Sequence, residues 1–176
     1  DLAFTMHMLS WLAVNGTAAI VEFPGVLYRG GAEQKIRKYL IDNNYVEAVI
    51  QLPPDLFFGT TIGTCIIVLK KSKTDDSVLF IDASERFVHV GNQNQLSPDD
   101  IAAIMDAYVK REPVEHFSAV ASLEDICKND YVLSVSGYVQ PKDTREKIDI
   151  AALNRQISDI VARENELRTQ IDAIVA

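Results

Sequence analysis

The chain has little of what secreted and membrane-bound proteins rely on. Its two cysteines, Cys65 and Cys127, are too few for a disulfide framework among 176 residues, and Cys65 lies inside an apolar run. No apolar run approaches the roughly 20 residues that a membrane-spanning helix requires. We therefore expect a reduced, cytoplasmic protein that makes no contact with a membrane.

Basic residues are also scarce. The chain has 17 Lys and Arg against 25 Asp and Glu, which gives a formal net charge of −8. Contacts with phosphates supply most non-specific affinity for DNA, so this charge argues against a protein that binds nucleic acid alone. Residues 1–71 carry six basic and six acidic side chains, so the acidic excess lies after them. A role on DNA would need a partner, or would use this neutral first half.

Familiar motifs are missing as well. There is no P-loop, no GxGxxG, no zinc-ligand spacing and no GxSxG, so the sequence predicts no phosphate-binding loop, no metal ligand and no serine nucleophile. The N-terminus, Asp1-Leu2-Ala3-Phe4, has no initiator methionine and no signal-peptide features, which is typical of an excised or proteolysed piece. With 48% hydrophobic residues, the chain can still bury a core.

The first half of the chain alternates helix and strand patterns. Apolar residues from Leu2 to a cap at Asn15-Gly16 predict a helix, and the run 17–23 predicts a buried parallel strand. Residues 32–44 predict a second helix, and residues 45–52 predict a second strand. This order implies an α/β fold with a right-handed βαβ unit in a mainly parallel sheet.

The helix predicted over 32–44 is amphipathic. Its apolar face carries Ile36, Tyr39 and Leu40. The other, polar face carries Lys35, Arg37 and Lys38.

The second half begins with strands. Runs 64–69 and 77–81 predict two of them, and no helix fits between 45–52 and 64–69, so these two strands should be antiparallel neighbours. Serine caps then begin two further predicted helices, over 97–111 and 122–128.

Residues 148–176 predict an amphipathic helix of coiled-coil type. Its apolar positions alternate spacings of four and three, with Glu164 interrupting the stripe once. These positions are Leu153, Ile157, Ile160, Leu167, Ile171 and Ile174.

Several residues invite a functional interpretation that the pattern does not support. Pro53-Pro54 lacks the acceptor and the aromatic of an amino-methyltransferase loop, and is better explained as the end of a strand. The three histidines are scattered and have no local partner for catalysis. Asp82 and Gly30-Gly31 are each better explained as turn formers than as sites.

The segment 55–65 is the informative one. It places two adjacent aromatics, Phe57 and Phe58, on a Gly- and Thr-rich loop before an apolar strand. Exposed rings on such a loop indicate a binding function, whereas rings folded onto the core would only add to packing. The pattern alone leaves both readings open.

Residues 52–71 resemble the segment that closes the catalytic domain of type I restriction–modification DNA adenine-N6 methyltransferases. The resemblance covers nearly the whole chain and includes several further segments in order. These are Asp1–Phe4, Phe23–Leu27, Ile36–Leu40, Phe80–Ser84, Asn92–Leu96 and Asn129–Val139.

The resemblance implies the C-terminal part of the modification subunit. Its fold would be part of a Rossmann-like S-adenosylmethionine-dependent methyltransferase domain (1–96), then a helical or irregular extension (97–147) and C-terminal helices, of which 148–176 would dock to another subunit. In that family the Gly-rich cofactor loop and the Asn-Pro-Pro-Phe loop precede the position of Asp1. We therefore expect no tight binding of S-adenosylmethionine and no activity from this chain alone.

The resemblance also implies partners and a target-base site. The intact subunit would methylate adenine N6 in double-stranded DNA, within a complex that holds a specificity subunit and a restriction subunit. Phe58, more than Phe57, would stack on the flipped adenine. Two alternatives remain at this point: half of a small-molecule methyltransferase, and a structural assembly module.

Overall fold

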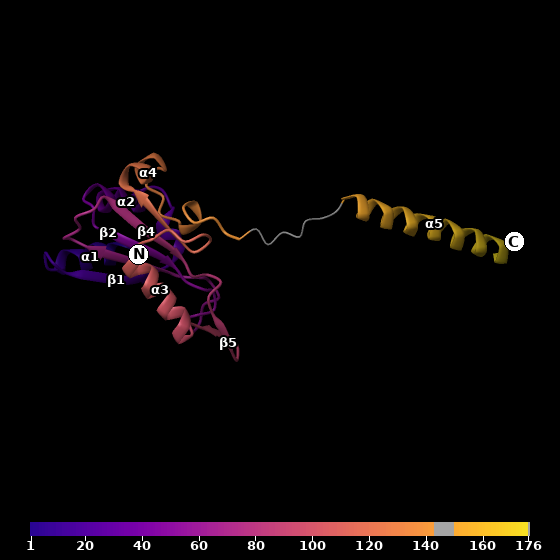
Figure 1. Cartoon of the computed structure of the whole chain (residues 1–176), viewed down its shortest axis with the longest axis horizontal. Coiled ribbons are helices and arrows are strands. Elements are labelled where there is room, and N and C mark those ends of the chain that lie inside the picture. The colour runs from indigo at the N-terminus through magenta and orange to yellow at the C-terminus, as the bar shows by residue number, and fades with distance from the viewer. Residues whose placement is uncertain (143–149, 176) are drawn as a thin grey trace. The chain divides into compact units, whose positions relative to one another are not determined.

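The computed structural model describes residues 1–142 and 150–175. Residues Asp1–Lys142 form one compact unit, and helix α5 (Ile150–Val175) belongs to a second (Figure 1). The helices of the first unit are α1 (Leu2–Trp11), α2 (Ala32–Asp42), α3 (Pro98–Lys110) and α4 (Leu123–Lys128). Its strands are β1 (Thr17–Glu22), β2 (Val46–Gln51), β3 (Cys65–Lys70), β4 (Ser77–Asp82), β5 (Val88–Val90), β6 (Gln93–Gln95) and β7 (Ser118–Ser122).

Five of the strands form one sheet in the order β1-β3-β2-β4-β7. The predicted antiparallel pairing of β2 with β3 is confirmed. The prediction of a mainly parallel sheet is wrong, because β2–β4 is the one parallel pair of the four that make up the five-stranded sheet among the described residues. Strands β1 and β2 do run in the same direction, since both are antiparallel to β3, but β3 lies between them.

Each face of the sheet carries its own core, as the two-residue period of strands requires. In β3, Cys65, Ile67 and Leu69 belong to the first core, whereas Ile66 and Val68 pack in the second. Helices α1, α2 and α4 contribute to the first core. Helix α3 covers the second core with Ile104 and Ala107.

The predicted element bounds need three corrections. Helix α1 ends at Trp11 instead of Asn15-Gly16, because Leu12 turns to an extended conformation and its carbonyl accepts a hydrogen bond from Lys71 at 2.6 Å. Strand β1 is not buried: its residues alternate between exposed and half-buried. Strands β5, β6 and β7 were not predicted, and β7 extends the sheet into the segment expected to be helical or irregular.

Helices α3 and α4 begin as predicted. Ser97 accepts a hydrogen bond from the Asp100 backbone N–H, and the Asp100 carboxylate accepts one in return from the Ser97 N–H. Ser122 caps α4 in the same way, through the Asp125 backbone N–H. No helix in the described part of the chain has the length and apolar character to cross a bilayer.

Arg37 is the largest departure from the predicted helix faces. It was placed on the polar face of α2, yet it is only 2% exposed. Its guanidinium donates to three backbone carbonyls, those of Val26, Arg29 and Tyr131, at 2.7–2.8 Å. Burial lowers its pKa from the usual value. Arg37 therefore joins α2 to the segments around residues 26–29 and 131.

We expect Arg37→Ala to lower the free energy of unfolding by about 2 kcal/mol, because one buried and two partly buried carbonyls lose a charged donor. Chemical denaturation measures this change. Lys35→Ala, an exposed position on the same helix, is the control and should change stability by less than about 0.5 kcal/mol. Equal effects of the two substitutions would show that the guanidinium contacts do not stabilise the fold.

Candidate functional site

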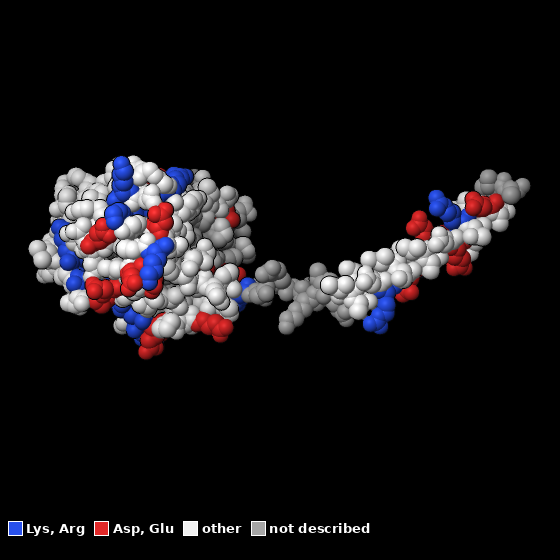
Figure 2. Space-filling model, turned by 90° about the horizontal axis from the view of Figure 1, so that it is seen from above, with Lys and Arg blue, Asp and Glu red and all other residues white. Residues whose placement is uncertain are grey.

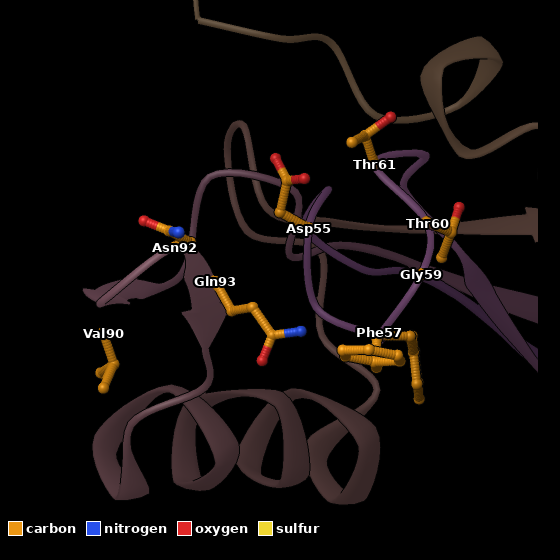
Figure 3. Close-up of a pocket in the computed structure, with 9 residues that line it drawn as sticks. Asp55, Phe57, Gly59, Thr60, Thr61, Val90, Asn92 and Gln93 are labelled. Carbon is orange, nitrogen blue, oxygen red and sulfur yellow. The ribbon is translucent and has the colours of Figure 1, made fainter.

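A pocket of about 440 Å³ lies between two segments that are distant in the sequence. One wall is the loop after β2, with Asp55, Phe57, Phe58, Gly59, Thr60 and Thr61. The other wall is the β5–β6 hairpin, with Val90, Asn92 and Gln93. Figure 3 shows the Gln93 side chain extending from the hairpin across the pocket toward Phe57. The loop was predicted as a site, whereas the hairpin wall was not.

The two rings of the loop differ in exposure. Phe58 is 96% exposed, Phe57 is 41% exposed, and Leu56 packs against the second core. The alternative in which both rings fold back onto the core is therefore wrong for Phe58. The Phe58 ring buries almost no surface within the chain and is therefore available to a flat apolar partner.

The backbone of the loop explains how Phe58 comes to project. Gly59 has φ +80°, a left-handed conformation that other residues adopt only with strain. At Gly63 an added Cβ would come within 3.2 Å of the Leu52 carbonyl oxygen, so the chain passes too close to β2 for a side chain there. The two glycines let the loop leave β2, turn after Phe58, and return into β3.

The polar groups of the pocket suit a planar ligand with a polar edge. Asp55 supplies acceptors, Asn92 and Gln93 supply both donors and acceptors, and Thr60 and Thr61 supply hydroxyls. A flat ring stacked on Phe58 could form hydrogen bonds with these side chains through its rim. The residues of this pocket include no histidine, lysine, arginine or cysteine, so it offers binding and no evident nucleophile.

The other candidates of the sequence have ordinary roles. Asp82 accepts hydrogen bonds from the N–H and hydroxyl of Ser84, as expected of a turn former. The exposed His7 ring contacts that of Trp11 in a tilted arrangement, and His116 forms a hydrogen bond with the Gln140 carbonyl. Burial raises the pKa of the Cys65 thiol to about 12, so this side chain is an unreactive part of the core. Within residues 1–142 and 150–175, no cluster of metal-ligating side chains could hold an ion.

A second pocket, of about 370 Å³, tests whether the chain could hold a nucleoside cofactor. It lies between the sheet and α3, and apolar residues such as Ile66, Val68 and Met105 make up most of its lining. S-adenosylmethionine carries a charged amino-acid group and ribose hydroxyls, which need polar partners that this lining does not offer. The second pocket therefore does not fit that cofactor.

Helix α5 presents the stripe that the sequence predicts. The six residues Leu153, Ile157, Ile160, Leu167, Ile171 and Ile174 are all 46% exposed or more. Glu164 occupies one position of the stripe, at the point where the three–four spacing would place another apolar residue. Figure 2 shows the charged side chains of α5 separated by long uncharged stretches.

Comparison with known sequences identifies the family of this chain. Residues 1–147 match the N-6 DNA Methylase family. The chain belongs to this family. It is 46% identical to the MpnII methylase subunit of a type I restriction enzyme from Mycoplasma pneumoniae, over 99% of this chain and 32% of that protein. The chain therefore spans about a third of the length of the curated relatives it matches.

Solved structures agree with the fold of this chain. The type I restriction–modification methyltransferase subunit from Streptococcus thermophilus is 43% identical, with a TM-score of 0.78 over 80% of this chain and 30% of that one. A structure described as the basis of complex assembly in the type I system is 18% identical, with a TM-score of 0.62 over 97% of this chain and 39% of that one. At 18% identity, the similarity to the second structure is evidence for the fold alone. Together they confirm the predicted α/β methyltransferase-type fold.

Proposed function

We propose that this chain is the C-terminal part of a type I modification subunit that methylates adenine N6 in DNA with S-adenosylmethionine. Membership of the N-6 DNA methylase family and 46% identity to a type I methylase subunit support the activity of the longer protein. The segment 1–96 would supply the end of the methyltransferase sheet, and 97–147 an extension of it. The reduced, cytoplasmic setting is part of this proposal.

The exposed ring of Phe58 carries the proposal for the target base. A base flipped out of the duplex loses stacking and pairing, and the protein must replace these interactions. A face-on phenylalanine replaces stacking without any charge, which suits a chain with a net charge of −8. On the face of the first unit seen in Figure 2, basic and acidic side chains are interspersed, so that face has no broad basic surface for a duplex. Phe57, half-exposed, would support the loop beside it.

The second part of the proposal is that α5 docks to the specificity subunit. The complex would also contain the restriction subunit and would bind double-stranded DNA. The apolar stripe needs a partner surface of matching shape. Glu164 defines that surface further, because an acidic side chain within an apolar seam calls for a basic side chain opposite it. A second copy of α5 would instead set Glu164 against another carboxylate in a parallel pair.

The 176-residue chain alone should neither bind S-adenosylmethionine tightly nor methylate DNA. The groups that would hold the methyl donor and the adenine amino group carry the rate, and distant residues cannot replace them. Isothermal titration calorimetry and a methyl-transfer assay on adenine measure both activities. Micromolar cofactor binding would favour a complete small-molecule methyltransferase, and methyl transfer to adenine would contradict our account directly. We expect to detect neither cofactor binding nor methyl transfer.

A further inference from the structure

The loop that carries Phe58 is held at its first residues by two hydrogen bonds from Asn94, one from its side chain and one from its backbone. Asn94, in the middle of β6, is only 3% exposed. Its amide donates from Nδ2 to the Pro54 carbonyl at 2.8 Å, and its backbone N–H donates to the Asp55 carbonyl at 3.0 Å. These two bonds join segments that lie about 40 positions apart and that form the opposite walls of the pocket.

The backbone at this junction is held in an unusual conformation. Asp55 has φ +53°, in the left-handed region that residues other than glycine seldom adopt. The bond from the Asn94 N–H to the Asp55 carbonyl acts on this residue directly. Any residue other than proline at position 94 could donate this backbone bond, whereas the bond to the Pro54 carbonyl, one residue before the strained position, is specific to the Asn94 side chain.

The stability of the fold alone does not explain the Asn94 side chain. Its second amide atom, Oδ1, is buried and has no hydrogen-bond partner among the described residues. A buried acceptor without a donor costs free energy, so an apolar side chain of similar shape would remove this cost together with the bond to Pro54. The same replacement leaves the Pro54 carbonyl without its donor, so the two effects on stability oppose each other. What would be lost is the direction of the loop.

We propose that Asn94 is a positioning residue, which ties the Pro54–Asp55 backbone to the β5–β6 hairpin and so sets where the Phe58 ring stands in the pocket. The neighbours of Asn94 fit this role: Gln93 lines the pocket and Leu96 packs against the second core. The hairpin thus links the core to the loop. This inference rests on the proposed stacking of Phe58 on the target base.

The test uses a full-length subunit containing this chain, assembled with its partner subunits, and two DNA duplexes. One duplex carries the target adenine and the other an abasic site in its place. Asn94→Leu should weaken binding to the adenine duplex by roughly 3- to 30-fold, because a displaced ring stacks poorly. Binding to the abasic duplex should not change, since it offers no base to stack. Gln95→Leu, the same change at the exposed next position, is the matched control and should bind both duplexes as the wild type does.

A double-mutant cycle with Phe58→Ala separates this inference from the proposed function. If Asn94 acts through Phe58, adding Asn94→Leu to Phe58→Ala should cause no further loss. Equal losses on both duplexes, or fully additive losses, would overturn the positioning role while leaving the stacking proposal intact. No effect of Phe58→Ala alone would overturn both. If Asn94→Leu and Asn94→Ala each unfold the subunit on thermal denaturation, Asn94 is structural and the inference is wrong.

Discussion

Phe58→Ala, made in a full-length subunit assembled with its partners, is expected to weaken binding or methylation of the target adenine by roughly ten- to a hundredfold. Stacking of a base on an aromatic ring contributes about 1–3 kcal/mol, which corresponds to that range. The ring is 96% exposed, so its removal takes nothing from the core, and thermal stability should barely change. Cofactor affinity should be unchanged too, because the loop does not resemble a cofactor site.

Phe57→Ala is the matched comparison for this prediction. Phe57 is adjacent to Phe58 and more buried, so its loss should reduce stability more and adenine binding less. Methylation kinetics and thermal denaturation of both variants distinguish the two rings. If Phe57→Ala gave the binding defect and Phe58→Ala left binding intact, the two rings would have to exchange roles.

Changing Ile157 and Ile171 on α5 to Asp should abolish assembly with the specificity subunit while the first unit stays folded. Burying six such side chains at about 25 cal/mol per Å² contributes several kcal/mol, and two carboxylates within the seam would reverse that gain. Co-purification with the specificity subunit measures assembly. Circular dichroism reports whether the α/β unit is intact.

The control for the docking prediction places the same charges elsewhere on α5. Ala162 and Thr169 lie off the apolar stripe, so Ala162→Asp with Thr169→Asp should leave assembly unchanged. Glu164→Lys should weaken assembly, since the proposed basic side chain of the partner would then meet a like charge. Survival of assembly in the Ile157→Asp, Ile171→Asp variant would remove α5 from the interface.

Most helices and strands can be predicted from the sequence, but not all of the pairings between the strands. The helices follow from apolar spacing, and α3 and α4 also from their serine caps. The β2–β3 pairing follows from the lack of room for a helix between them. The partner of β1 could not be predicted, because its pairing with β3 joins residues up to 53 positions apart, as Thr17 with Lys70. Strand β7 was missed since Ser-Ala-Val-Ala-Ser is short and small at the edge of the sheet.

One of the two walls of the candidate site could be predicted from the sequence. The loop with Phe57 and Phe58 was singled out, since exposed aromatics beside glycines are unusual. The hairpin wall was missed, because Asn92, Gln93 and Asn94 are polar and their role depends on contacts far along the chain. The burial of Arg37 could have been predicted from its position. It lies three and four residues before Leu40 and Ile41, which are buried, and this spacing places it on the same helical face.

Photochemical cross-linking tests the central claim most directly. A duplex with 5-iodouracil at the target position, bound to the assembled full-length subunit and irradiated, should attach to the side chain stacked on the flipped base. Mass spectrometry of the digested protein then identifies that residue. Our account predicts attachment at Phe58, with loss of the product in Phe58→Ala. Attachment outside the loop from Asp55 to Thr61 would contradict it.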